Sequence, residues 1–266
     1  MVKKLWRRRE RLLPNEDDAE RAGTLGEERR DETGVPAANR RGDLASYDEL
    51  RAGFTAAVSH ELRTPLARVL ALLETALLPG AETTALVEQA RAEVEQTREL
   101  IDEILFLSEL ETGLEVVSLG STRVAGVAAE VFSELRDRAD RAGVELRSDV
   151  EGDVELPLRR RLVRVVIENL AENAIRYAGE GAVFTLSAGR DDDRLTLTGS
   201  DTGAGVAAAD LPRLFERFFR ADRARASRGT GLGLAIVKHI VTAAGGTVEA
   251  RSARGSGLVI RCTFSA

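Results

Sequence analysis

Residues 54–66 read FTAAVSHELRTPL and lie in a stretch of helical periodicity that covers residues 47–112. Its apolar side chains recur at steps of three and four, the spacing that places them on one face of an α-helix. This stripe consists of Phe54, Val58, Leu62, Leu66, Val69 and Leu73. His60 falls about 160° from the centre of the stripe when each residue turns the helix by about 100°. We therefore expect the His60 imidazole to face solvent, beside Glu61 and one turn before Thr64.

The pair Pro79-Gly80 interrupts this periodicity, and a second stripe follows it. The second stripe consists of Val87, Ala90, Val94, Thr97, Ile101, Ile104 and Ser108. Two helices of about 30 residues joined by a short turn form an antiparallel hairpin. A single hairpin cannot cover both stripes, so the pattern predicts dimerisation into a four-helix bundle.

The N-terminal part of the chain has a different composition. Residues 2–11 carry six basic side chains, and the residues after them are highly charged with almost no apolar periodicity. We therefore expect residues 1–45 to form a flexible, charged lead-in. The basic start around Trp6 fits either a solvated tail or contact with an anionic membrane surface. The domains expected after it are the hairpin, residues 46–114, and a second domain, residues 115–266.

The second domain mixes helical and strand-like segments. Helices are expected within residues 124–142, 161–178 and 229–246, and strands within residues 144–150, 182–189, 194–201, 247–252 and 258–264. This mixture predicts an α+β sandwich, in which helices cover one face of a sheet.

The composition excludes several kinds of site. The chain has 38 basic and 44 acidic side chains, so a net charge of -6 gives no global attraction to nucleic acid. A single cysteine, Cys262, excludes a disulfide scaffold and a cysteine-ligated zinc site. No lysine lies in the Gly-Lys-Ser/Thr context of a P-loop. No stretch approaches the ~18 to 20 apolar residues of a membrane-spanning helix, so we expect a soluble protein.

Residues 169–177 carry polar side chains at helical spacing. Asn169, Asn173 and Tyr177 are four residues apart and share one helix face, with Arg176 beside them. Amide oxygens one turn apart can ligate Mg²⁺, while a tyrosine can stack on a base and an arginine can pair with phosphate. The alternative is a helix that only happens to carry amides on its polar side.

Two glycine-rich segments are candidate ligand loops. Residues 201–205 read DTGAG, where Asp201 can accept a hydrogen bond from an exocyclic amine. Gly203 and Gly205 would let the backbone approach a ligand. Residues 229–233 read GTGLG and lead into an apolar helix whose N-terminal amides favour phosphate. By itself, each segment is also explained as a tight turn.

In their order and spacing, these segments closely resemble the catalytic core of bacterial two-component sensor histidine kinases, over residues 46–265. SHELRTPL is similar to the H box of that family, NLAENAIRY to its N box and DTGAG to its first glycine box. FERFFR, residues 215–220, is similar to the F box, and GTGLGLAIVKHIV to the second glycine box. The resemblance implies a helical hairpin followed by an ATP-binding α/β sandwich of the Bergerat (GHKL) type.

The resemblance also implies catalytic roles. His60 would be the phosphorylated nucleophile, and Glu61 would orient it and accept its proton. Thr64 would position water when the protein acts as a phosphatase on its partner. Asn173 would hold Mg²⁺, with Asn169 beside it.

For ATP, the resemblance implies that Asp201 contacts the adenine amine and that Tyr177 packs on the base. Arg176 stands where the family usually has lysine, and it would contact phosphate together with Arg220. The remaining implied nucleotide-binding residues are Gly203, Gly205, Gly229, Gly231, Leu232 and Gly233.

The function implied is autophosphorylation of His60 by ATP, followed by transfer to an aspartate in the receiver domain of a response regulator. The protein would work as a homodimer in the cytoplasm or at the inner face of the plasma membrane, and it would not bind nucleic acid. Membrane association would come from a sensor region outside this sequence, and a hinge near residues 113–122 would let the two domains approach. Two alternatives remain open at this point: an ATP-binding signalling scaffold without kinase activity, and a protein that acts mainly as a phosphatase.

Overall fold

The computed structural model describes residues 37–112, 120–191, 193–221, 229–253 and 255–266, with side chains from residue 55 onward. The chain divides into two compact units, Met1–Ala52 and Gly53–Ala266. Several expectations concern residues outside this description: the flexible lead-in up to residue 36 with its basic start around Trp6, the Phe54 side chain and most of the hinge.

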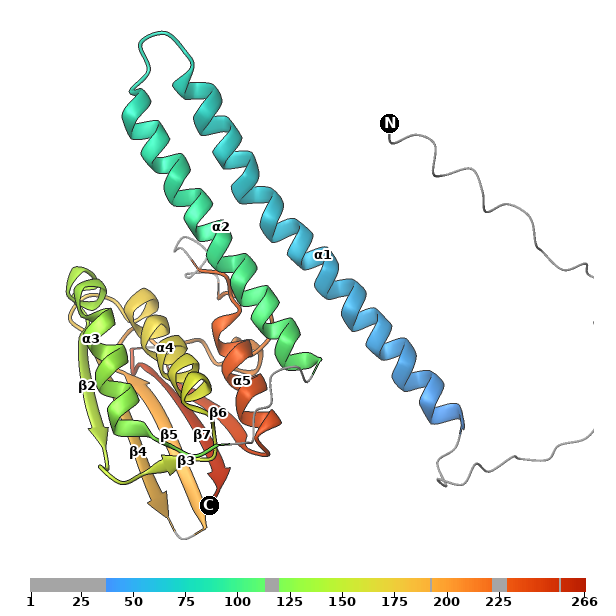
Figure 1. Cartoon of the computed structure of the whole chain (residues 1–266), viewed down its shortest axis with the longest axis vertical. Helices are drawn as coiled ribbons and strands as arrows, with labels where there is room; N and C mark the ends of the chain where they lie inside the picture. The colour runs from blue at the N-terminus through green and yellow to red at the C-terminus, as the bar shows by residue number, and fades with distance from the viewer. Residues whose placement is uncertain (1–36, 113–119, 192, 222–228, 254) are drawn as a thin grey trace, which may run out of the picture. The chain divides into compact units, whose positions relative to one another are not determined.

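Two long helices form the hairpin, α1 (Ala37–Ala76) and α2 (Thr83–Glu111). The part of α1 that follows Gly53 runs antiparallel to α2 (Figure 1). Gly80 lies in the connecting turn with a φ of 80°, a left-handed conformation that glycine adopts without strain. The expected hairpin is confirmed.

The start of α1 corrects the expected extent of the lead-in. The helix begins at Ala37, so residues 37–45 are helical although we expected them to be flexible. These residues, AANRRGDLA, include three alanines, two arginines and a leucine, which favour helix whether or not an apolar stripe is present. As a result α1 has 40 residues, more than the expected 30 or so.

The hairpin has an inner face and an exposed apolar face. Val58, Leu62 and Val69 are half-buried. The large exposed apolar side chains are Leu66, Leu70, Leu73, Leu77, Leu78, Val87, Val94, Ile101 and Leu105, which are 40% to 85% exposed. One chain therefore leaves apolar surface of both helices uncovered, as the two stripes predicted. No helix in the described part of the chain is both long enough and apolar enough to cross a membrane.

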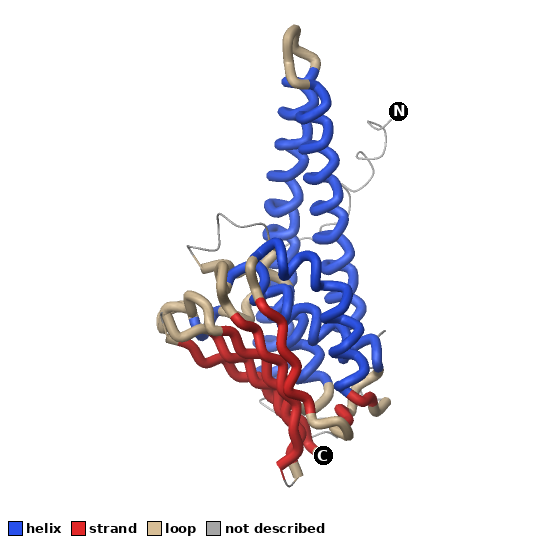
Figure 2. The backbone as a smooth tube through the Cα atoms, turned by 90° about the vertical axis from the view of Figure 1, so that its left-hand side faces the viewer, coloured by secondary structure: helices blue, strands red, loops and turns tan. Residues whose placement is uncertain are grey.

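The second domain is built on a five-stranded sheet with the order β2-β4-β5-β7-β6. The strands are β2 (Glu145–Val150), β4 (Val183–Asp191), β5 (Arg194–Asp201), β6 (Thr247–Ser252) and β7 (Leu258–Ser265). Strands β2 and β4 pair in parallel, and the other neighbours are antiparallel. Three helices, α3 (Val124–Ala142), α4 (Arg160–Tyr177) and α5 (Gly233–Ala243), cover one face of this sheet (Figures 1 and 2). The expected sandwich is confirmed.

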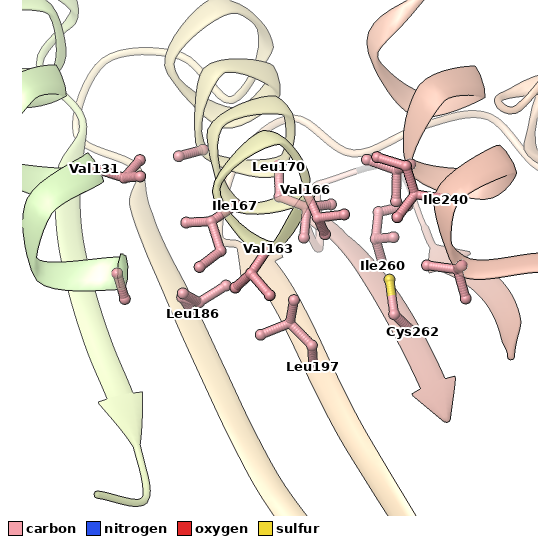
Figure 3. Packing of buried hydrophobic residues seen from close by; sticks show 14 of the residues in the cluster. Val131, Val163, Val166, Ile167, Leu170, Leu186, Leu197, Ile240, Ile260 and Cys262 are labelled. Atoms are coloured by element: carbon pink, nitrogen blue, oxygen red, sulfur yellow. The ribbon is translucent and has the colours of Figure 1, made fainter. Parts of the chain in front are cut away.

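The core lies between these helices and the sheet. Alternate residues of each central strand are buried, for example Leu195 and Leu197 on β5, because side chains of a strand point to opposite faces in turn. Figure 3 shows Val163, Val166 and Ile167 of α4 above Leu186 and Leu197 of the sheet. Each of these five side chains is fully buried.

Two short elements were not predicted from the sequence pattern. A two-stranded ribbon pairs β1 (Thr122–Arg123) with β3 (Glu155–Leu156), and the 3-10 helix η2 covers Leu211–Arg213. Strands of two residues are too short to show an alternation of apolar and polar side chains.

Candidate functional site

A cavity of about 330 Å³ opens beside α4, the loop after β5 and the start of α5. This volume lies in the range typical of small-ligand sites. The expected residues that line it are Asn169, Asn173, Arg176, Tyr177, Asp201, Gly205, Arg220, Gly231 and Gly233. Four sequence segments, separated in the chain, thus converge on one cavity.

The two asparagines have different surroundings. Asn169 donates from Nδ2 to the carbonyl of Val165 at 2.8 Å, and its Oδ1 lies against Gly233 so closely that a side chain there would overlap it. Asn173 follows one turn later and lines the cavity. Asn169 therefore joins α4 to the start of α5, and Asn173 is the better placed of the two to hold a cation.

Arg176 is held in place by an acidic neighbour. Its Nη2 lies 2.8 Å from Oε2 of Glu172, one turn earlier on α4, and both side chains line the cavity. A guanidinium has five N–H donors, so Arg176 can bond Glu172 and a phosphate oxygen at the same time. The role of Glu172 was missed by sequence reasoning, although it directly precedes Asn173.

Asp201 ends β5 at the edge of the cavity. Its Oδ1 accepts a hydrogen bond from the amide of Gly203 at 2.8 Å. Burial raises the pKa of Asp201, and hydrogen bonds from the backbone of Gly203 and Leu258 oppose part of that rise. The result is a half-buried carboxylate that is already oriented and can accept a hydrogen bond from a base amine.

The first glycine loop fits tightly between its neighbours. A side chain at Gly203 would overlap Ala178, which follows the last residue of α4. Gly203 therefore packs against the end of α4 and does not line the cavity. A side chain at Gly205 would overlap the carbonyl of Ala253, and Gly205 has a φ of 66°. Both positions require glycine because other backbone lies where a Cβ would be.

The second glycine segment contacts both α4 and the F box. A side chain at Gly229 would overlap the Tyr177 hydroxyl. Gly231 has a φ of 74° and its carbonyl accepts from the Phe218 amide at 3.0 Å. Leu232 is fully buried in the core, so its side chain does not face the cavity.

The cavity also receives a side chain from the hairpin. Glu103 of α2 lines it, and its Oε2 accepts a hydrogen bond from Thr230 Oγ1 at 2.5 Å. Burial raises the pKa of Glu103, while the hydrogen bond to Thr230 and the charge of Arg176 act in the opposite direction. Sequence reasoning missed Glu103 because its spacing in α2 does not differ from that of an ordinary polar position.

The candidate phosphoacceptor lies on α1. The side chains of His60 and Glu61 are 75% and 40% exposed, and His60 Nδ1 lies 3.6 Å from Glu61 Oε1. Thr64 Oγ1 donates to the His60 carbonyl at 3.4 Å. The outward imidazole predicted from the helical stripe is therefore present, with a carboxylate beside it.

The fold and the cavity define a class: a ligand cavity in an α+β sandwich, joined to a helical hairpin that carries an exposed histidine. Residues 158–266 match the family model of histidine kinase-, DNA gyrase B- and HSP90-like ATPases. Residues 50–113 match the His Kinase A (phospho-acceptor) domain. The chain belongs to the two-component sensor histidine kinases.

Relatives with curated names support this assignment. The sensor-like histidine kinase SenX3 of Mycobacterium tuberculosis is 34% identical over 81% of this chain and 54% of its own length. The phosphate regulon sensor PhoR of Pseudomonas aeruginosa is 32% identical over 82% of this chain and 51% of its own. The chain thus spans about half the length of the curated relatives it matches.

Solved structures show the same fold. The histidine kinase AdeS of Acinetobacter baumannii superimposes with a TM-score of 0.65 at 27% identity, over 77% of this chain and 97% of AdeS. The histidine kinase ShkA, solved in complex with AMPPNP, gives a TM-score of 0.60 at 28% identity, over 79% of this chain and 46% of ShkA.

Proposed function

We propose that this chain is the catalytic part of a sensor kinase that phosphorylates its own His60 with ATP and passes the phosphoryl group to an aspartate of a response regulator. One observation carries the proposal. Asn173, Arg176, Tyr177 and Asp201 meet at one cavity in a chain that also presents an exposed imidazole beside a carboxylate.

The chemistry is an in-line attack by a neutral imidazole nitrogen on the γ-phosphorus. The N–P bond forms, the bond to the ADP oxygen breaks, and the Glu61 carboxylate takes the imidazole proton. Histidine suits this step because its reference pKa of ~6.5 leaves neutral imidazole available near pH 7. The cavity contributes positioning and the guanidinium groups of Arg176 and Arg220. Positioning and charge stabilisation supply most of the catalysis in phosphoryl transfer.

The donor set of the cavity suits magnesium. Mg²⁺ prefers oxygen ligands and usually takes only one or two from the protein, with water and phosphate completing its shell. The Asn173 amide supplies such an oxygen at the cavity wall. Bound there, Mg²⁺ would neutralise charge on the phosphates, and Arg176 would add a second positive contact.

Dimerisation follows from the exposed apolar face of the hairpin. Leucines such as Leu66 and Leu70 are 59% and 58% exposed, and Val94 on α2 is 53% exposed. Pairing two hairpins into a four-helix bundle would cover these side chains. His60 points away from the apolar stripe and would stay accessible to a regulator.

A second activity is dephosphorylation of the same regulator. The observation that favours it is the exposed Thr64 one turn after His60, where a hydroxyl could position a water molecule. The variant Thr64→Ala should keep autophosphorylation and lose most of the phosphatase activity. If Thr64→Ala removes phosphate from the regulator as fast as the parent protein, this second activity does not depend on Thr64.

The proposal is tested by incubating the full chain with magnesium and γ-labelled ATP. We expect acid-labile, base-stable label in the parent protein, none in His60→Gln, and bound ATP in both. Adding an isolated receiver domain should then move the label to an acid- and base-labile acyl phosphate. If the parent protein binds ATP and takes up no label, the chain is a nucleotide-binding scaffold and the kinase proposal fails.

A further inference from the structure

Glu172 of α4 bonds two arginines, one inside the nucleotide cavity and one outside it. Its Oε2 lies 2.8 Å from Arg176 Nη2, and its Oε1 lies 2.6 Å from Arg138 Nη1 on α3. Glu172 and Arg176 line the cavity, and Arg138 does not. The two oxygens of one carboxylate are thus divided between two guanidinium groups.

The charge of the cavity makes this arrangement significant. Among the described residues, the acidic and basic side chains of its lining are Glu103, Glu172, Asp201, Asp210, Arg176 and Arg220. This excess of carboxyl groups, four against two guanidinium groups, disfavours binding of a ligand that carries several negative phosphate charges. Glu172 is the acid in direct contact with Arg176, so its charge acts on the group proposed to contact phosphate.

The Arg138–Glu172 ion pair differs in its orientation from the other ion pairs between α3 and α4. Glu130 and Glu134 of α3 pair with Arg160 and Arg164 of α4, which places the acid on α3 and the base on α4. At the end nearest the cavity the order is reversed, and Arg138 of α3 faces an acid of α4. The reversal puts an additional positive charge next to the cavity lining.

We propose that Arg138 is a positioning residue for the phosphates of ATP, acting through Glu172 on Arg176; this inference rests on the proposed function. By taking one oxygen of Glu172, Arg138 neutralises its charge and prevents it from gripping Arg176 with both oxygens. Arg176 then keeps N–H donors directed to phosphate. Arg138 itself touches neither the base nor the phosphates.

The test compares nucleotide binding by the full chain and its variants in the presence of magnesium. Arg138→Gln should weaken ATP and ADP binding by roughly three- to tenfold, the size of effect expected for one charge in a partly solvated pair. Adenosine binding should not change, because adenosine has no phosphate. The matched control is Arg160→Gln, which removes an α3–α4 ion pair of the same kind far from the cavity lining and should leave all three affinities as they are.

Two further variants separate charge from structure. Arg138→Lys keeps the positive charge and should keep most of the ATP affinity. The double variant Arg138→Gln with Glu172→Gln removes the acid left without its α3 partner, and it should bind ATP more tightly than Arg138→Gln alone. All variants should show thermal unfolding midpoints close to that of the parent protein.

Three results would overturn the inference: unchanged ATP affinity in Arg138→Gln, an equal loss for adenosine and ATP, or no recovery in the double variant. These outcomes differ from a failure of the proposed function. In that case the parent protein itself would bind no ATP, or would bind it without modifying His60.

Discussion

The Asn169 amide on α4 lies directly against Gly233, the first residue of α5. Asn169 is fixed there by the hydrogen bond from its Nδ2 to the Val165 carbonyl, and its Oδ1 occupies the space that a Gly233 side chain would need. This contact determines how close the second glycine segment comes to α4, and so it shapes the cavity between them.

Replacing Gly233 with alanine should therefore destabilise the domain, although alanine usually favours helix. We expect a cost of about 1–3 kcal/mol from overpacking, together with weaker ATP binding. Gly126, in the first turn of α3, has open space around it and is the matched control. Gly126→Ala should raise stability by about 0.5–1 kcal/mol. Urea unfolding curves measure both changes, and equal effects at the two positions would contradict the packing argument.

Asp201 should make nucleotide binding depend on pH. Burial raises the pKa of Asp201. Its carboxyl group is therefore ionised above that raised value, and on acidification it takes up a proton at a higher pH than an ordinary aspartate does. Adenosine isolates this effect, since it carries no titrating phosphate. We expect adenosine affinity to fall as the pH drops through this range, and Asp201→Asn to weaken binding by roughly ten- to hundredfold at neutral pH. A pH profile of Asp201→Asn that still follows that of the parent protein would assign the titration to another group.

Glu103 should reduce the stability of the chain at neutral pH. A carboxyl group whose pKa is raised by burial contributes stability below its ordinary value of 4.5, and that contribution is lost as the pH rises through the raised value. Glu103→Gln keeps the neutral form, so its unfolding midpoint should exceed that of the parent protein at pH ~7 and match it at pH ~4. Glu109→Gln, an exposed position on the same helix, should show no such difference.

Cys262 should report on unfolding of the ATP-binding domain. Its side chain is fully buried on β7, and burial raises the pKa of its thiol to about 12. Thiol reagents need the thiolate and access to it, so labelling should occur only after the domain opens. Leu186→Ala, a change in the core that costs about 2–5 kcal/mol, should accelerate labelling markedly. Leu77→Ala, at a side chain that is 85% exposed, should leave the rate unchanged. Fast labelling of the folded parent protein would show that the core around β7 is open.

Periodicity predicted the elements of the second domain closely. Helix α3 and strand β6 have the bounds expected from the sequence, because each carries a regular apolar pattern along its whole length. The same method missed the start of α1, where helix propensity acts without an apolar stripe. It also missed the ribbon of β1 and β3, which is too short to show a pattern.

The sequence predicted residues that line the candidate site, but not the contacts that hold them in place. The resemblance supplied Asn173 and Asp201, which line the cavity, but also Leu232, whose side chain faces the core. Glu103 could not be predicted because its hydrogen-bond partner, Thr230, lies 127 positions away in the sequence. Arg138 likewise reaches Glu172 only because α3 and α4 pack together.

The central claim is that ATP bound in this cavity phosphorylates residue 60. Mass-spectrometric mapping of phosphate on the full chain, after incubation with Mg-ATP and handling at alkaline pH, tests it most directly. We predict phosphohistidine at His60 in the parent protein and much less in Asp201→Asn at an ATP concentration that does not saturate the variant. ATP-saturated protein with His60 unmodified, or with the phosphate on a different residue, would contradict the claim.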